Sequence, residues 1–130
     1  MTIFSKIIAG EIPSYKVAEN PDFYAFLDIR PLVKGHVLVV PKIETDYLFD
    51  LDDKTLGDMM IFSKRVAKAI KNAIPCKRIG LTVIGMEVPH AHIHLVPLTK
   101  ESDIFFDNPK QIFTSEEFKE IAEAIEANFK

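Results

Sequence analysis

The sequence lacks the features that mark secreted and membrane proteins. It contains no tryptophan and a single cysteine, Cys76, which excludes a disulfide within the chain. No stretch approaches the roughly eighteen consecutive apolar residues that a membrane-spanning helix needs. The first residues have neither the basic region nor the unbroken apolar run of a secretory signal. We therefore expect a cytoplasmic protein that does not enter a membrane.

An excess of positive charge is also missing. The formal net charge is −3, and acidic and basic residues are interspersed along the chain. Binding to the phosphates of DNA or RNA requires a basic surface. Nucleic acid is therefore not expected as a partner.

The composition is that of an ordinary soluble globular protein. Of the 130 residues, 48% are hydrophobic and 27% are charged. The chain contains no internal repeat and no linker rich in glycine and serine. We expect a single domain over residues 1–130, in which residues 99–130 form a C-terminal extension with a helix.

The spacing of apolar residues predicts an α+β fold. Helical spacing predicts a short helix over residues 3–9 and a long helix over residues 53–74, capped by Asp52 or Asp53. A capping box that begins at Thr114 predicts a final helix. Runs rich in β-branched and aromatic residues predict five strands, at residues 15–18, 23–29, 36–40, 78–84 and 90–96. We expect one five-stranded antiparallel sheet with the long helix packed on it.

Three of the four histidines alternate in the last predicted strand, at His90, His92 and His94. Alternate side chains of a strand share a face, so the three imidazoles should lie on the more exposed face. The residues between them, which should face the core, are Ala91, Ile93 and Leu95. Three imidazoles without partners would be costly to bury, so a purely structural role explains the pattern poorly.

Two kinds of chemistry remain open from these residues. Neutral imidazoles bind zinc, but a zinc site needs three or four converging ligands, and only His36 and scattered carboxylates are available to complete one. Alternatively, one neutral imidazole attacks phosphorus while its neighbours donate hydrogen bonds to the phosphate oxygens. The pattern alone does not separate the two.

The run from His90 to Val96, HAHIHLV, resembles the His-φ-His-φ-His-φ-φ motif of the histidine triad (HIT) superfamily. The segments TIFSKIIAGEIPSYKV and YAFLDIRPLVKGHVLVVPK, near the N-terminus, are similar to its Hint-like branch. The likeness extends over residues 2–98. It implies the HIT-like α+β fold, a homodimer whose two sheets join into one, a purine nucleotide as substrate, and neither a cofactor nor a metal.

The resemblance also implies roles for particular residues. His92, the middle histidine of the motif, would attack the α-phosphorus, and His90 would support it from the same strand. His94 and His36 would contact the phosphate oxygens. Asp28 would hold the ribose hydroxyls, since an ionised carboxylate only accepts hydrogen bonds.

Six apolar residues match the positions that enclose the base in the family. Taken one by one, each is more simply read as part of the hydrophobic core, although as a set they suit a base site. They are Ile3, Phe4, Ile7, Phe26, Ile29 and Leu38.

The sequence departs from the family in three places. Thr2 and Ser5 stand where many bacterial relatives have a zinc-binding Cys-x-x-Cys, so zinc is not expected there. Gly85-Met86-Glu87 replaces Gly-Gln-Ser or Gly-Gln-Thr. If its apolar neighbours keep Glu87 protonated, it could donate a proton to a leaving amine; otherwise it faces solvent. The C-terminal extension either covers the site of the other subunit or packs on the sheet.

Four functions follow from this sequence. The first is a hydrolase or transferase for purine nucleoside 5′-phosphoramidates or related adenylylated compounds, acting through a nucleotidyl-histidine. The second is a dinucleoside polyphosphate hydrolase of the Fhit-like kind. The others are a nucleotide-binding protein without turnover and a metal-binding protein.

Overall fold

The computed structural model describes the whole chain, residues 1–130, and confirms the predicted α+β fold. Its five strands form one antiparallel sheet in the order β1-β2-β3-β5-β4. The strands are β1 (Lys16–Glu19), β2 (Phe23–Leu27), β3 (Val37–Pro41), β4 (Arg78–Thr82) and β5 (Ile93–Leu98). The helices are α1 (Ile3–Ile8), α2 (Asp53–Ala73) and α3 (Ser115–Asn128), with short 3-10 turns at Leu48–Asp50 and Glu101–Ile104.

Each helix begins at a side-chain cap. Thr2, Asp52 and Thr114 accept hydrogen bonds from the backbone N–H groups of Ser5, Thr55 and Glu117, which lack partners inside the helices. The predicted capping box is present, because the carboxylate of Glu117 also accepts the backbone N–H of Thr114. These caps fix where the helices start.

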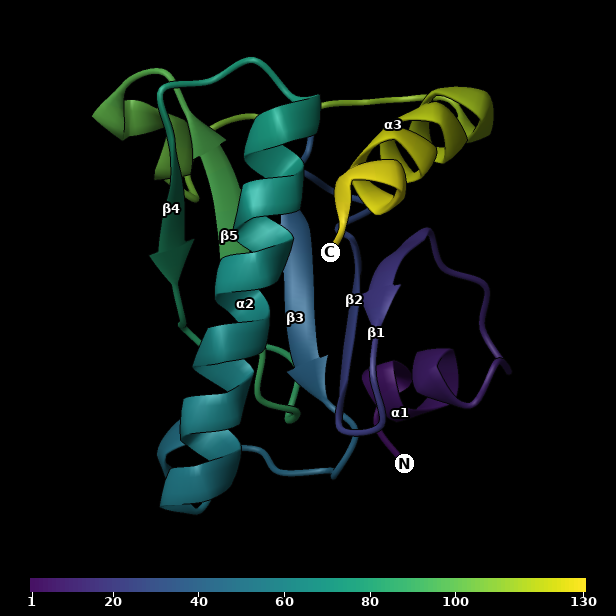
Figure 1. The fold of residues 1–130 in the computed structure, drawn as a ribbon, viewed down its shortest axis with the longest axis vertical. Coiled ribbons are helices and arrows are strands. Elements are labelled where there is room, and N and C mark those ends of the chain that lie inside the picture. The colour runs from purple at the N-terminus through teal and green to yellow at the C-terminus, as the bar shows by residue number, and fades with distance from the viewer.

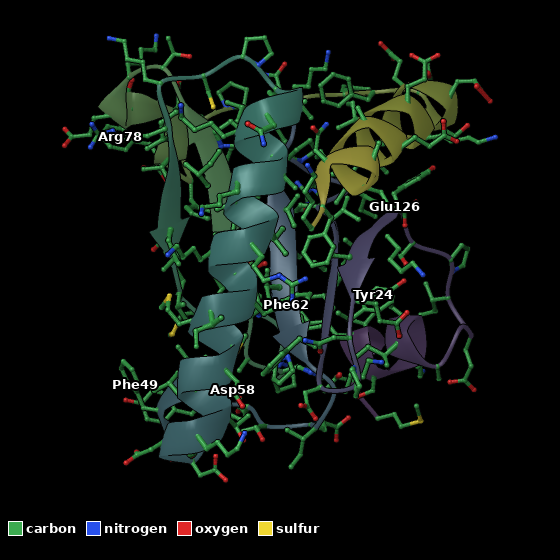
Figure 2. All side chains as sticks on the ribbon, in the orientation of Figure 1. Tyr24, Phe49, Asp58, Phe62, Arg78 and Glu126 are labelled. Atoms are coloured by element: carbon green, nitrogen blue, oxygen red, sulfur yellow. The ribbon has the colours of Figure 1, made fainter.

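One face of the sheet, which we call the core face, is covered by α2 with α3 beside it (Figure 1). Phe62 points from α2 toward the strands (Figure 2), and its ring centroid lies 5.7 Å from that of Phe23. The buried strand residues of this face are Val17, Ala18, Phe23, Ala25, Leu27, Val37, Val39, Ile93 and Leu95.

The C-terminal helix belongs to this same layer. Its buried residues join the main core, and the ring of Phe118 stacks on that of Tyr15 at 5.1 Å between centroids. Of the two placements considered for the C-terminal extension, α3 thus takes the one on the sheet of its own chain. No helix of the chain has both the length and the apolar character needed to cross a membrane.

The opposite face of the sheet, which we call the histidine face, carries α1 and a smaller cluster. Phe4 and Ile7 of α1 pack against Tyr24, Phe26, Leu38 and Val40 of β2 and β3. These strand residues alternate with those of the core face. Both faces are therefore buried over the centre of the sheet.

The last strand begins later than predicted. It starts at Ile93, because its pairing with β3 ends where Ile93 meets Val39. Before that point Ala91 N–H bonds to the carbonyl oxygen of Thr45 at 2.6 Å, in the loop after β3. His90 and His92 therefore lie just before β5, although the alternation continues and Ala91 still faces the core.

Candidate active site

The four histidines converge on the histidine face from two directions. His92 and His94 lie before and within β5, and His36 immediately precedes the neighbouring strand β3. None of the four imidazoles is more than 7% exposed, so the expected exposed row of histidines is wrong. Their burial is possible because each ring has hydrogen-bond partners.

A turn ahead of β3 brings His36 into the site. Gly35 adopts a φ of +91°, a conformation that disfavours residues with a side chain. A Cβ at this position would also lie 2.9 Å from Ile74 Cγ1, at the end of α2. Glycine is therefore required where the chain turns back toward the sheet.

The hydrogen bonds of His92 determine which nitrogen can react. Nδ1 lies 2.7 Å from the carbonyl oxygen of His90, which can only accept, so Nδ1 carries the proton. In the neutral ring the lone pair is then on Nε2, and this nitrogen has no hydrogen bond within the chain. The Phe4 ring lies edge-on, 5.1 Å from the imidazole centroid. His92 is therefore held with Nε2 free to act as a nucleophile.

A relay of hydrogen bonds orients His94. The backbone N–H of Leu32 donates to His36 Nδ1 at 3.0 Å, so in neutral His36 the proton is on Nε2. That Nε2–H points to His94 Nδ1 at 3.0 Å, which places the proton of neutral His94 on its own Nε2. The ring centroids of His94 and His92 are 5.0 Å apart. A hydrogen-bond donor thus lies beside the nucleophile.

Burial keeps these imidazoles neutral. Burial, with smaller contributions from His94 and Lys110, lowers the pKa of His36 to about 3, and burial together with His92 lowers the pKa of His94 to about 4. Burial also lowers the pKa of His90. At neutral pH the relay therefore has the protons assigned above.

His36 differs from what the resemblance implies. Its imidazole is buried, and both ring nitrogens are already bonded within the chain, to Leu32 and to His94. No donor remains on His36 for a phosphate oxygen. The geometry instead gives it a supporting role, because it fixes the tautomer of His94.

Asp28 lies at the end of β2, next to this relay. Its Oδ1 accepts the backbone N–H of Arg30 at 2.9 Å, and its Oδ2 lies 3.7 Å from His36 Nε2. Burial raises the pKa of the carboxyl, while the Arg30 N–H and the positive charge of Lys110 lower it. The net effect is a raised pKa. Oδ2 accepts no hydrogen bond within the chain, so it has acceptor capacity toward a ligand at the edge of the site.

The six apolar residues divide into two groups. Four are buried in the α1 cluster, as the core interpretation predicts: Phe4, Ile7, Phe26 and Leu38. Ile3 and Ile29 are 50% and 67% exposed, so the core interpretation is wrong for these two. Ile3 is the first residue of α1 and Ile29 lies two residues after β2, and both remain available to a ligand at the protein surface.

Comparison with known proteins shows the family of this chain. Residues 9–101 match the model of the HIT domain. The chain belongs to the HIT family. The match includes all four histidines and Asp28, but ends before α3.

Two curated HIT relatives have a named activity. The adenosine 5′-monophosphoramidase HNT1 of Saccharomyces cerevisiae is 43% identical over 100 residues, covering 76% of this chain but only 63% of the yeast protein. The adenosine 5′-monophosphoramidase hnt1 of Schizosaccharomyces pombe is 35% identical over 98% of both chains. The crystal structure of a HIT-like protein from Bartonella henselae matches with a TM-score of 0.84 and 33% identity, covering 98% of this chain and 96% of that one.

Two residues beyond the matched HIT domain reach the site, and no periodic pattern of the sequence predicts them. The ring centroid of Phe106 lies 4.9 Å from that of His94 and 6.3 Å from that of His36. Lys110 donates to the carbonyl oxygen of Phe106 at 2.6 Å, and its charge acts on Asp28 and His36. Gln111 N–H ties the segment to the carbonyl oxygen of Pro31 at 2.8 Å. The aromatic pair at 105–106 was the only hint in the sequence.

Glu87 does not have the surroundings that proton donation would require. Its side chain is exposed, and Met86, which was expected to shield it, is 84% exposed. In the single chain Glu87 therefore faces solvent, as the second of the two interpretations has it.

One group in the site has the composition of a metal site. Asp28, His36 and His94 each offer a ligand atom, and the three atoms lie within 4.8 Å of one another. A divalent cation there would have to replace the hydrogen bond between the two imidazoles. The site thus has two competing uses for the same nitrogens.

Proposed function

We propose that this HIT protein is a nucleotide hydrolase or transferase that acts on purine nucleoside 5′-phosphoramidates or related adenylylated compounds. One observation carries the proposal: His92 is fixed with its Nε2 lone pair free, beside the Nε2–H donor of His94. The two fungal relatives named as adenosine 5′-monophosphoramidases support the substrate class. A dinucleoside polyphosphate hydrolase would use the same groups and differ in the leaving group.

The first step forms a covalent bond to His92. Its Nε2 lone pair attacks the α-phosphorus, and the bond from phosphorus to the leaving group breaks with both electrons going to the leaving group, which takes a proton from water. The imidazole becomes positively charged while Nδ1–H still donates to the carbonyl oxygen of His90, 2.7 Å away. This contact stabilises the charge that develops on the ring.

The second step releases the nucleotide. A water molecule attacks the same phosphorus, the bond to Nε2 breaks, and the electron pair returns to the imidazole. The products are a nucleoside monophosphate and neutral His92, with one proton released to solvent. In both steps His94 Nε2–H donates to a non-bridging phosphate oxygen, and His36 holds that donor in place.

The nucleoside would bind between Asp28 and the start of α1. Asp28 accepts hydrogen bonds from the ribose hydroxyls. Phe4 touches the rings of both His90 and His92, at 5.7 and 5.1 Å between centroids, so a base lying on the α1 cluster would be next to the nucleophile. The exposed side chains of Ile3 and Ile29 would cover its edges.

We also propose a homodimer that joins the two sheets through β4. This strand is at the edge of the sheet. Leu81 on β4, Val83 and Ile84 just after it, and Met60 and Ile61 on α2 leave large apolar side chains exposed. An unpaired edge with exposed apolar residues favours pairing with a second copy. Sedimentation equilibrium tests this, and a monomer at micromolar concentration would contradict it.

The decisive experiment compares hydrolysis of adenosine 5′-phosphoramidate by the wild type and by His92→Ala, with EDTA present throughout. We expect turnover in the wild type and a loss of at least about a thousandfold in the variant, because its nucleophile is gone. AMP binding by both proteins serves as the control for folding. Turnover that persists in the variant would contradict the mechanism.

Other outcomes would redirect the assignment. Hydrolysis of diadenosine polyphosphate without hydrolysis of the phosphoramidate would favour a dinucleoside polyphosphate hydrolase. AMP binding with neither activity would favour a binding protein. Loss of activity on adding EDTA to protein as purified would favour a functional metal at Asp28, His36 and His94.

A further inference from the structure

A cluster of hydrogen bonds joins the start of α1 to the segment that carries the nucleophile. We call it the N-terminal clasp, and its members are Thr2, Ser5, Glu44 and His90. Thr2 Oγ1 lies 2.7 Å from His90 Nδ1, and Ser5 Oγ lies 2.7 Å from Glu44 Oε1. The backbone N–H of Thr2 donates to the same Glu44 oxygen at 2.8 Å. Residues that are far apart in the sequence thus meet next to the histidines of the site.

The direction of each hydrogen bond in the clasp can be assigned. His90 Nε2 lies 2.8 Å from the carbonyl oxygen of Pro41, which only accepts, so Nε2 carries the proton. In the neutral ring Nδ1 must then accept, and its donor is the Thr2 hydroxyl at 2.7 Å, since the Ser5 hydroxyl is 3.5 Å away. Thr2 Oγ1 also lies 3.1 Å from Ser5 Oγ, but its one proton goes to the shorter contact with His90. Thr2 has a single hydroxyl proton, so its oxygen accepts the backbone N–H of Ser5 at 3.0 Å. The Ser5 hydroxyl is left to donate to Glu44.

These bonds fix His90 at both ring nitrogens, and this matters for His92. The carbonyl oxygen of His90 accepts His92 Nδ1–H, the bond that directs Nε2 toward the substrate. Phe4, two residues after Thr2, packs edge-on against both imidazoles. A shift of the His90 backbone would therefore rotate the nucleophile.

We propose that Thr2 and Glu44 are positioning residues for His92, acting through His90; this rests on the proposed function. Thr2 donates directly to His90, while Glu44 orients Thr2 and Ser5 from the loop after β3. The hydroxyl at position 2 has two tasks, since it also caps α1. A test must separate the two.

The chain offers a matched control. Thr114 caps α3 in the same way, with its side chain accepting Glu117 N–H at 3.1 Å, and α3 packs on the core face. Thr114→Val and Thr2→Val therefore remove the same residue type from the same capping position. Only Thr2→Val removes a donor to His90.

The experiment measures kcat, KM and thermal midpoint for four variants: Thr2→Val, Thr2→Ser, Thr114→Val and Glu44→Gln. We expect Thr2→Val to lower kcat roughly tenfold with KM nearly unchanged, the order expected for one lost hydrogen bond in a buried site. Thr2→Ser should recover most of kcat because it keeps the hydroxyl. Thr114→Val should lower the midpoint to a similar extent without changing kcat, and Glu44→Gln should lower kcat by about twofold to threefold.

The contrary results are equally definite. Wild-type kcat in Thr2→Val, no recovery in Thr2→Ser, or an equal loss in Thr114→Val would each overturn the positioning role. A second readout does not depend on turnover: two-bond ¹⁵N–¹H correlation spectra report the tautomer of each histidine. We expect the Nε2–H form of His90 in the wild type, with mixed tautomers in Thr2→Val.

This readout separates the two proposals. If no substrate is turned over, the proposed function fails, yet the His90 tautomer still tests the clasp. If the wild type is active but His90 is in the Nδ1–H form, the clasp is wrong and the function stands.

Discussion

The two faces of this sheet are built from alternate residues of the same strands, yet they are stabilised in different ways. On the core face Ile93 and Leu95 contact α2 and its neighbours and are buried among apolar side chains. On the histidine face His94, the residue between them, is buried to nearly the same extent beside His36 and His92. The same degree of burial therefore stabilises the core face but is by itself unfavourable for the imidazoles of the histidine face.

On the core face, burial itself is favourable, at about 25 cal/mol for each square ångström of apolar surface removed from water. On the histidine face, burial of polar rings is unfavourable and is offset only because each ring has at least one hydrogen-bond partner within the chain. The hydrogen bonds that offset this cost also fix the tautomers and orientations. A site with preset donors needs little reorganisation when charge develops.

The largest effect on stability should come from the core face. Ile93→Ala removes three buried carbons from the centre of the main cluster. We expect it to lower the free energy of unfolding by about 2 to 5 kcal/mol, measured by urea unfolding at pH 7. His92→Ala, one residue away, should cost less stability and nearly all activity. If both variants lost equal stability with activity retained, the two faces would not differ as described.

A change on the histidine face should have a smaller effect with a pH dependence. His36→Leu fills the same space with an apolar side chain of similar size, but it leaves the buried Leu32 N–H without its acceptor. We expect a loss of about 1 to 3 kcal/mol in unfolding free energy at pH 7. We also expect kcat to fall roughly tenfold, since His94 loses the donor that sets its tautomer.

The pH dependence of this variant follows from the lowered pKa of His36. Burial brings it from 6.5 to about 3, so between these values the unfolded chain binds a proton that the folded chain does not. The stability from neutral His36 is complete above pH 6.5 and is lost as the pH falls toward 3. The difference in unfolding free energy between the wild type and His36→Leu should be smaller at pH 5 than at pH 7 by about 2 kcal/mol. An unchanged difference would contradict the assignment of His36 as neutral.

A still smaller effect is expected where the C-terminal segment meets the histidine face. The charge of Lys110 lowers the pKa of Asp28, so Lys110→Met should raise it and leave less ionised carboxylate at low pH. We expect KM to rise about twofold to fivefold at pH 5 and hardly at all at pH 8. Lys119→Met, an exposed lysine on α3, is the control. An equal rise at both pH values would point to a direct contact with substrate instead.

The difference between the faces also explains what could be predicted from the sequence. The core face follows from periodicity, because apolar burial needs only the spacing of Ala91, Ile93 and Leu95. The number of strands was predicted correctly for the same reason. The start of β5 was not predicted correctly, since the strand begins only at Ile93, the first of its residues to pair with β3, opposite Val39.

The histidine face could be predicted only in part. The triad and Asp28 were found through their motif, but the internal role of His36 depends on Leu32 and His94, whose contacts come from tertiary packing. Phe106 and Lys110 lie in an irregular segment without periodicity. Hydrogen bonds between residues far apart in the sequence produce no local sequence pattern, so they could not be predicted from it.

The smallest effect is expected at Glu87, which tests where the site ends. This side chain is exposed beside the positive-φ turn at Gly85 and has no hydrogen bond to the histidine face. Glu87→Gln should therefore leave the pH profile of kcat unchanged and alter kcat by less than about twofold, as for most exposed substitutions. Steady-state kinetics from pH 5 to 9 with adenosine 5′-phosphoramidate provide the measurement. A basic limb that disappears in the variant would show that Glu87 delivers a proton in the assembled enzyme, and would extend the site beyond the groups held by the sheet.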